Sequence, residues 1–378
     1  MSSAGAGAPT GQGLPRMVVV LVGLAAALLV VAGLRGLAGI IGPVFLAFVL
    51  TIATQPVRLA AERRGIPGWA GAVVALLLIY AGLIGLTVAL TVSVARFATL
   101  LPSYEAEVDR MRDSVVDWLG RLGVGEEQIQ EIVGGFDLGR LVELAGNLVS
   151  GLLGVLSSLF LVITLVLFMV ADAARFSAKL RLLPASHEPF TSALTGFGVA
   201  TRRYIVVSTV FGLIVAVLDT VALMWLGVPV AVLWGLLSFI TNYIPNIGFV
   251  IGVVPPAIIG LLEGGPRLMI SVLVVYSVLN VVIQSIIQPK IVGDTVGLSA
   301  TLTMISLVFW AYTLGAVGAL LAVPLTLFAK ALLVDADARA QWLRPLMSGQ
   351  QATSAPMVVQ PVRRGPKGRG EPPPEEGR

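Results

Sequence analysis

The polar side chains embedded in the longest apolar stretches are the groups of this sequence best suited to chemistry. Asp219 is the first of them, because it lies deep in the apolar run Tyr204–Leu226. An acid at the centre of a membrane helix costs about 2.5–3.5 kcal/mol on insertion scales, so it is a functional candidate by default. We expect Asp219 to relay a proton or a cation. The alternative is a protonated or hydrogen-bonded structural acid beside Thr220.

A second group of polar residues interrupts the apolar segment 227–262. Asn242, Pro245, Asn246 and Gly248 stand there, where an uninterrupted spanning helix has leucine and valine. Proline removes a backbone donor and disfavours helix in the residue before it, so the helix must stop or kink. The asparagines and the carbonyl groups freed by the proline are candidates to bind a polar solute or an ion. Alternatively, the asparagines only cap the two broken helix ends.

A third group follows one face of the next long helix. Asn280, Gln284 and Gln288 are spaced four residues apart, which places them in one row on an α-helix. A polar row in a membrane helix faces protein or water. It either joins helices by hydrogen bonds or lines a pathway, and the spacing leaves both open.

Enzymatic chemistry finds little support in the sequence. The chain has no cysteine and a single histidine, His187, which lies in a polar turn. The sequence has no cluster of metal ligands, no nucleophile–histidine–acid set in its membrane segments and no glycine-rich phosphate loop. We therefore expect a protein that is not an enzyme, has no cofactor and no resident metal, and is not an ATP-driven pump.

The composition indicates a membrane protein. Of the 378 residues, 57% are hydrophobic and 12% are charged, whereas soluble domains have about 25% charged residues. The mean hydropathy is +0.94. The net charge of +4 falls in short loops and in the tail, which fits a membrane orientation better than nucleic-acid binding. The lipid bilayer is the expected partner, and nucleic acid is not.

The apolar runs predict an all-α polytopic membrane protein with about eight transmembrane segments. Helices are expected at 17–34, 37–53, 69–97, 148–171, 204–226 and 268–288. Two of them end at a proline, at Gln55-Pro56 and Pro289-Lys290. The remaining segments, 227–262 and 296–333, are broken, the second at 312–315 and at Val323-Pro324. The expected order is a disordered N-terminus (1–16), transmembrane helices 1–3 (17–101), an acidic amphipathic extracytoplasmic region (102–147), transmembrane helix 4 and a cytoplasmic loop (148–203), a broken-helix transport core (204–334) and a disordered cytoplasmic tail (335–378).

The helical excursion at 102–147 differs in charge from the other polar segments. Ten acids and four arginines lie between Glu105 and Glu143, whereas arginine and lysine dominate the loops at 58–64 and 172–203. Because positively charged loops stay in the cytoplasm, we expect both termini inside and the acidic excursion outside. The excursion is either a solvated hairpin packed on the membrane domain, or a gating element, a cap or an oligomer contact.

Segments 204–262 and 268–333 follow one plan, a long helix and then a glycine-broken apolar segment. Two glycines are 21 residues apart in each copy, Gly227 and Gly248 in the first, Gly297 and Gly318 in the second. The two long helices are expected to cross in opposite directions. Such an inverted repeat typically holds its substrate between the halves, near the midplane of the membrane. Each broken segment is either a re-entrant hairpin or a pair of full crossings.

A series of short motifs runs through this region. They are LGVP at 226–229, NYIPNIG at 242–248, QPKIVG at 288–293, VGL at 296–298, GxxG at 315–318 and AVP at 322–324. In this order they resemble the autoinducer-2 exporter (AI-2E) family of bacterial inner-membrane transporters, and the resemblance covers roughly residues 17–335. Two departures concern Leu298-Ser299-Ala300, where the family often has Leu-His-Pro, and Asn246 with Phe249, where it often has an aromatic residue or a Gly-Pro pair.

The resemblance implies a homo-oligomeric secondary transporter of the bacterial plasma membrane. Members of the family are linked to export of a furanosyl signal or to sodium/proton exchange. We expect this chain to move a small polar solute or signal molecule, with ion coupling through Asp219. The departures mean that the substrate itself is not carried over. The alternatives are a sodium(or potassium)/proton antiporter and a non-transporting scaffold whose excursion and tail recruit partners.

Overall fold

The computed structural model of the protein describes residues 15–121, 159–173, 175–176, 178–180, 182–184, 187–245, 247–292, 297–337, 339–343 and 347. All regular secondary structure in these ranges is helical, which confirms the all-α prediction. Asn246 and most of the two predicted terminal segments lie outside the described residues. The acidic region is described as far as Arg121 only.

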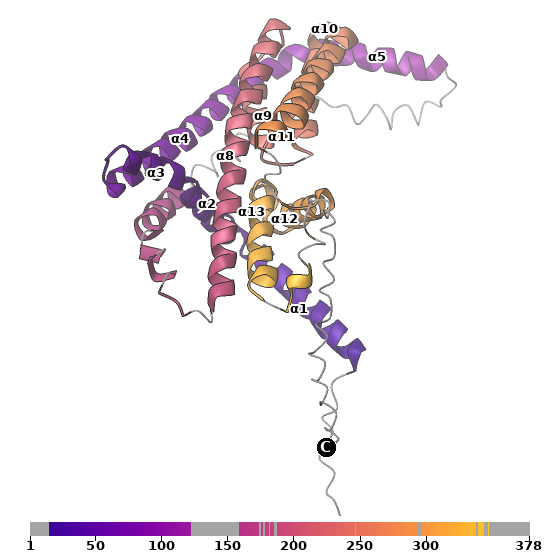
Figure 1. Ribbon diagram of the computed structural model, residues 1–378. Helices are drawn as coiled ribbons and strands as arrows, with labels where there is room; N and C mark the ends of the chain where they lie inside the picture. Colours follow the sequence, from indigo (N-terminus) through magenta and orange to yellow (C-terminus); the bar gives the residue numbers. More distant parts are fainter. Residues whose placement is uncertain are drawn as a thin grey trace, which may run out of the picture.

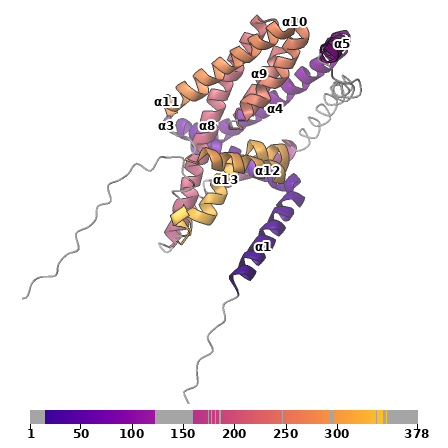
Figure 2. The ribbon, with the colours of Figure 1, turned by 90° about the vertical axis from the view of Figure 1, so that its right-hand side faces the viewer.

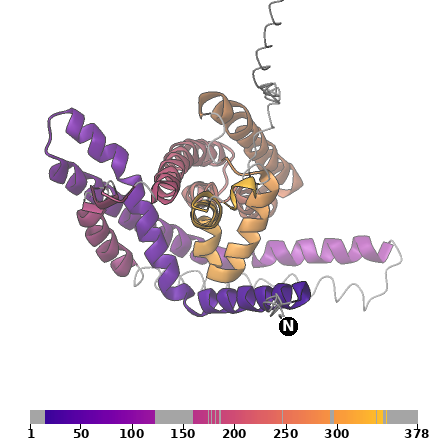
Figure 3. The ribbon, with the colours of Figure 1, turned by 60° about the horizontal axis from the view of Figure 1, so that its bottom comes forward.

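Two apolar helices, α1 (Arg16–Gly36) and α2 (Ala38–Ala53), begin the described chain. They form where the apolar runs predict them, and they meet at an angle instead of lying side by side (Figure 3). The loop predicted after Gln55-Pro56 is wrong, because Pro56 lies in the first turn of a further helix, α3 (Gln55–Arg63). Proline is tolerated there, since the first N–H groups of a helix have no partner within it.

The long apolar helix α4 (Gly68–Leu100) leads into the acidic region. A 3₁₀ turn, η1 (Leu101–Tyr104), links it to the charged amphipathic helix α5 (Glu105–Arg121). Helix α5 projects away from the other helices at one end of the molecule (Figure 1). The predicted helical character of the acidic region is therefore confirmed over its described part.

The central element of the fold is α8 (Glu188–Trp225). It begins at Glu188 and not at the predicted Tyr204, so part of the predicted polar loop is helix. Hydropathy misses this part because it is polar, although its inner face, with Ala193 and Phe197, is buried. Figures 1 and 2 show two helix pairs at opposite ends of α8, one pair beside its C-terminal half and one beside its N-terminal half.

The first helix pair consists of α9 (Ala231–Thr241) and the start of α10 (Gly248–Asn280). Residues 242–247 separate the two helices, which confirms the interruption predicted at Pro245. Non-helical backbone at Gly264 and Gly265 then divides α10 into two helices. Gly265 has φ +68°, a conformation that glycine adopts without strain. This bend lies between the two predicted segments 204–262 and 268–333.

A π-helical segment, η3 (Val281–Ile287), and α11 (Gln288–Val292) continue α10. The prediction that Pro289 ends this helix is wrong, because Pro289 is the second residue of α11. Pro289 removes one backbone hydrogen bond of this continuous helix, and the helix nevertheless extends to Val292.

The second helix pair consists of α12 and α13 and is followed by two short turns. The bounds are α12 (Ala300–Leu320), α13 (Ala322–Lys330), η4 (Ala331–Asp335) and η5 (Gln341–Leu343). Gly315, with φ +67°, kinks α12 at the predicted interruption. The second predicted break, at Val323-Pro324, lies instead at Leu321, and Pro324 falls in the first turn of α13, where it is tolerated.

Two hydrophobic clusters hold the helix pairs against the rest of the fold. The cluster at the first pair joins Trp234 and Tyr276 to Val94 of α4 and Tyr104 of η1. The cluster at the second pair contains four phenylalanines from α2, α8 and α13, whose ring centroids lie 5.3–6.2 Å apart, Phe45, Phe48, Phe197 and Phe328. Each pair is therefore anchored at its own end of α8.

Six helices of the described ranges are long and apolar enough to cross a membrane. They are Met17–Gly36, Ala38–Arg63, Gly68–Arg121, Glu188–Trp225, Gly248–Ile291 and Ala300–Leu320. Two further apolar helices, Leu159–Ala173 and Ala231–Thr241, are shorter. The chain is thus built as a multi-pass membrane protein, and the count of eight segments stays a prediction.

We expect Gly248→Ala to destabilise the first helix pair. A Cβ at Gly248 would overlap the backbone carbonyl of Thr241, which cannot move without shifting α9 against α10. Overpacking of this kind costs about 1–3 kcal/mol, which would lower the Tm of the purified protein in detergent. Gly196→Ala is the matched control, since a Cβ there has nothing within 4 Å. An unchanged Tm of the Gly248 variant would contradict this packing.

Candidate functional site

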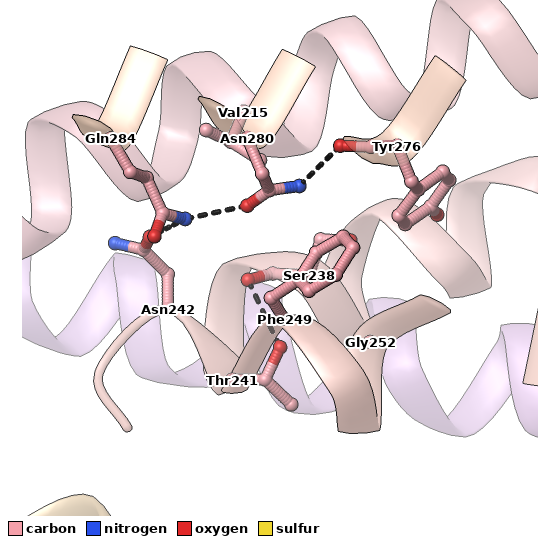
Figure 4. A pocket seen from close by; sticks show the side chains of 9 residues that line it. All are labelled: Val215, Ser238, Thr241, Asn242, Phe249, Gly252, Tyr276, Asn280 and Gln284. Carbon is pink, nitrogen blue, oxygen red and sulfur yellow. Dashed lines mark hydrogen bonds between the residues drawn. The ribbon is translucent and has the colours of Figure 1, made fainter. Parts of the chain in front are cut away.

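A small pocket lies beside the break, where α8, α9, both halves of α10 and η3 meet (Figure 4). The enclosed space has room for about one water molecule, far below the roughly 300–1,000 Å³ usual for drug-sized ligands. A solute larger than water can therefore enter only if the lining side chains move. The lining residues are Val215, Ser238, Thr241, Asn242, Phe249, Gly252, Tyr276, Asn280 and Gln284.

Three of the predicted site residues meet in this pocket (Figure 4). The Gln284 side-chain amide donates to the Asn242 Oδ1 at 3.0 Å and to the Asn280 Oδ1 at 2.7 Å. Asn280, which is buried, in turn donates to the carbonyl of Tyr276 at 2.9 Å. Asn242, Asn280 and Gln284 are named the amide triad below. The triad joins the break to the helix that follows it.

Asn242 is held in this position by α8. Its Nδ2 donates to the carbonyl of Ser208 at 2.8 Å. The close approach requires Gly212, because a Cβ there would lie 2.8 Å from the Asn242 Nδ2. The side chain of Asn242 thus bonds to α8 and, through Gln284, to η3, which is more than the capping of its own helix end.

Gln288 is not brought to the pocket, unlike the other two members of its predicted row. It lies half-buried in α11, beyond the π-helical segment. A π-helix has hydrogen bonds between residues five apart and so rotates each residue less than an α-helix does. The i, i+4, i+8 row expected for a regular α-helix therefore drifts away from the pocket before Gln288.

The backbone of the break is satisfied largely within the protein. The N–H of Ile244 donates to the carbonyl of Thr241 at 2.8 Å, and that of Gly248 donates to the carbonyl of Ile244 at 2.9 Å. Tyr204 of α8 donates its hydroxyl to the carbonyl of Tyr243 at 2.6 Å. These carbonyl groups, predicted as ligands, thus have partners already.

Pro245 and Gly248 shape the turn and do not line the pocket. The carbonyl of Pro245 accepts from the N–H of Ile247 at 2.8 Å, which tightens the chain between the two helices. Gly248 lets α10 start directly against the last turn of α9. The remaining predicted residue of this segment, Asn246, lies outside the described residues.

Asp219 lies next to the pocket without lining it. Its side chain is 0% exposed, and it stands four residues after Val215 on α8. The hydroxyl groups of Ser238 and Tyr276 are its polar neighbours. Within the described chain, however, no hydrogen bond of normal geometry reaches either carboxylate oxygen or either hydroxyl. Buried oxygens without partners are rare in proteins and require an explanation.

Sequence reasoning missed Ser238 and Tyr276. Tyr276 lies four residues before Asn280, so it extends the predicted polar row by one turn, and this spacing was a usable signal. Ser238 gave a weaker signal, because serine in a membrane helix commonly bonds to its own backbone.

Comparison with known proteins relates the sequence of this chain to one family. Residues 17–336 match the sequence profile described as AI-2E family transporter. The chain is 29% identical over 313 residues to "AI-2 transport protein TqsA" of Escherichia coli K12, covering 83% of this chain and 90% of the relative. It is 30% identical over 323 residues to "Putative transport protein" of Haemophilus influenzae, covering 82% and 90%.

Asn242 and Gln284 are expected to be energetically coupled. We expect the loss in unfolding free energy of the double variant Asn242→Ala/Gln284→Leu to be smaller than the sum of the single losses. The coupling should be about 0.6 kcal/mol and at most about 1.7 kcal/mol, the range found for hydrogen bonds between membrane helices. The measurement is denaturation of the four proteins in detergent. Asn242→Ala/Gln288→Leu is the control pair and should be additive; additivity in both pairs would refute the contact.

Proposed function

The chain belongs to the AI-2E family of transporters, since the family profile matches residues 17–336, and we propose that its pocket binds the transported molecule, a small polar solute or signal. It is a membrane transporter by this membership, which also favours a protein that is not an enzyme. The observation that carries the proposal is the amide triad at the break, in which Gln284 donates hydrogen bonds to both Asn242 and Asn280. We propose that the protein is located in the bacterial inner membrane.

The chemistry of the pocket favours an uncharged polar solute. Side-chain amides both donate and accept hydrogen bonds and carry no charge. The triad therefore matches hydroxyl and carbonyl groups, while Phe249 and Val215 supply apolar contact. The relative from Escherichia coli is named for transport of AI-2, which supports a small signal molecule as the cargo. Of the predicted site residues that do not line the pocket, Asn246 and Gln288 belong to the proposal as pathway residues.

The inverted repeat is part of the proposal, and the four repeat glycines support it. Gly227 and Gly297 both have positive φ, +77° and +62°. A Cβ at Gly248 would overlap the carbonyl of Thr241, and one at Gly318 would overlap the carbonyl of Trp310. The glycines that correspond in sequence thus have similar roles. The first of each copy has positive φ, and the second permits close packing, of α10 on α9 at Gly248 and of the two parts of the kinked α12 at Gly318.

Re-entrant hairpins are favoured over full crossings by the length of α9. Its 11 residues extend about 16 Å at 1.5 Å per residue, roughly half of the ~30 Å hydrocarbon thickness. The tip of the first pair bonds to Tyr204 and Ser208, near the middle of α8. If each helix pair is counted as one membrane segment, the two pairs and the other apolar helices give the proposed eight segments.

We propose that both termini face the cytoplasm. Tyr104 at the start of the acidic region donates a hydrogen bond to Glu263 in the turn of α10, so these two segments share one side of the membrane. Phe328 near the end of α13 packs on Phe197 in the first part of α8, so these share the other side. Both pairings agree with the charge bias of the loops.

We also propose that the protein forms a homo-oligomer. The apolar helix α1 supports it, because the window Met17–Gly36 is 0% buried within the chain and offers its surface to lipid or to another copy. The second candidate function is a sodium(or potassium)/proton antiporter, which the buried Asp219 favours. The third, a non-transporting scaffold, requires that variants in the pocket leave function intact.

Transport assays in proteoliposomes test the site. We expect Asn242→Ala and Asn280→Ala each to lower the initial rate of autoinducer-2 transport about tenfold or more, because each removes a side-chain amide that lines the pocket, at about 1–3 kcal/mol per lost hydrogen-bonding group. Thr195→Ala, on an exposed part of α8, is the control and should keep the wild-type rate. Full rates in both pocket variants would exclude the site. Cation-driven ΔpH changes without solute transport would favour the antiporter.

Cysteine labelling tests the orientation on a clean background, because the chain has no cysteine of its own. Arg267→Cys, in the exposed turn of α10, should react with an impermeant maleimide in intact spheroplasts. Thr195→Cys, at the opposite end of the bundle, should react only after permeabilisation. The reverse pattern would invert the proposed topology.

A further inference from the structure

The pocket beside the break is closed in this conformation. Because its enclosed space holds about one water molecule, a solute enters only after a lining side chain has moved. Most of the lining residues are buried, so a shift of their side chains would displace closely packed neighbours. Three lining residues are only half-buried, and they are Asn242, Phe249 and Gln284. The side chain that opens the pocket is therefore to be sought among these three.

Hydrogen bonds restrain Asn242 and Gln284. The Asn242 side chain donates to the carbonyl of Ser208 at 2.8 Å and accepts from Gln284 at 3.0 Å. Gln284 also donates to the Oδ1 of Asn280 at 2.7 Å. Displacement of either residue thus breaks two hydrogen bonds and leaves polar groups without partners, which is costly in a protein interior.

Phe249 has no such restraint. Its ring forms no hydrogen bond, and the ring-to-ring contacts among the described residues do not include it. In Figure 4 the ring lies among the other lining side chains. Of the three half-buried residues, Phe249 is therefore the one whose side chain moves at the lowest cost.

The position of Phe249 in its helix also favours movement of the side chain. Phe249 is the second residue of α10. In the interior of a helix the preceding turn excludes one of the three χ1 rotamers, whereas no regular turn of α10 precedes Phe249. The backbone next to it is fixed, because Gly248 packs directly against the carbonyl of Thr241. The ring can thus change rotamer while the helix stays in place.

We propose that Phe249 is the gate of the solute pocket. Its ring closes the pocket in this conformation and rotates to admit a solute, and the space that the ring leaves free limits the size of the solutes that enter. The inference rests on the proposed function, because the gate controls entry to the pocket assigned to the solute. Phe249 is then a specificity-determining residue, and the amide triad supplies the hydrogen bonds.

Cysteine accessibility in the purified full-length protein in lipid nanodiscs tests the gate without any transported solute. The chain has no cysteine, so Ser238→Cys places a single thiol on the wall of the pocket. N-ethylmaleimide reaches this buried position only through the open state, so its reaction, followed by mass spectrometry, should be slow. Addition of Phe249→Ala should accelerate the reaction about tenfold or more, and Phe249→Leu should accelerate it less, because the open state becomes more populated as the side chain shrinks.

Two controls separate a gate from a general loosening of the fold. Phe239 is also half-buried in the broken region, and its ring packs on Tyr243 outside the pocket, so Phe239→Ala should not accelerate the reaction. Ser208 is 6% exposed, as is Ser238, and does not line the pocket, so Ser208→Cys should stay slow in Phe249→Ala. Gel filtration and Tm establish that each variant is folded. An unchanged rate at Ser238→Cys, or acceleration at both cysteine positions, overturns the gate.

Transport in proteoliposomes tests the size limit. The probes are autoinducer-2 and sucrose, a larger uncharged polar molecule, and the readout is the ratio of their initial rates. Phe249→Ala should raise the ratio of sucrose to autoinducer-2 about tenfold or more, since removal of one side chain from a pocket wall changes discrimination by this order. Phe249→Trp should lower the rate for autoinducer-2, because the larger ring leaves less room. Phe239→Ala should keep the wild-type ratio, and a wild-type ratio in folded Phe249→Ala contradicts the proposal.

The two assays separate failure of the gate from failure of the proposed function. If the wild-type protein transports no autoinducer-2 while Phe249→Ala still exposes Ser238→Cys, the gate stands and the assigned cargo is rejected. If transport responds to Asn242→Ala while neither the thiol reaction nor the rate ratio responds to Phe249→Ala, the gate is rejected and the solute pocket stands.

Discussion

The structure depends on one constraint: a helix broken inside a membrane must have its polar backbone covered by protein, because hydrocarbon offers no partner. The first break meets this constraint at the middle of α8. Tyr204 bonds to the carbonyl of Tyr243, and the carbonyl of Ser208 receives the side chain of Asn242. The second helix pair is closed by an internal bond from Trp310 to Thr326 at 3.0 Å. Helix α8 serves as the common support for both pairs.

The side chains that form hydrogen bonds at the break are polar and lie side by side, so the same groups are available to bind a ligand. The amide triad is neutral and suits an uncharged solute, whereas Asp219 beside it is the one buried acid of the described chain. Ser238 and Tyr276 form part of both surroundings. A single packed junction of α8, α9 and α10 thus places two kinds of ligand chemistry against each other.

Sequence patterns predicted the features that arise from local chemistry. Apolar runs located the helices, and Pro245 and Gly315 located the breaks. The cost of polar groups in hydrocarbon selected Asp219 and Asn280, which are buried, and Asn242 and Gln284, which are half-buried. The errors arose where tertiary packing decides. Pro56 follows the predicted end of its helix but begins α3 instead of a loop. Pro289 and Pro324 were predicted to interrupt helices, although Pro289 lies within a continuous helix and Pro324 in the first turn of α13. Ser238 and Gln288 were misjudged because their surroundings depend on helix rotation, which a regular period does not give.

The bond between Tyr104 and Glu263 has a mechanical consequence. It fastens the root of α5 to the elbow at Gly264–Gly265, where α10 changes direction. That elbow is the outer corner of the helix pair that carries the pocket. Any rotation of this pair about α8 must therefore either move α5 with it or break the hydrogen bond between Tyr104 and Glu263. The position of the acidic helix is thus coupled to the position of the helix pair that contains the pocket.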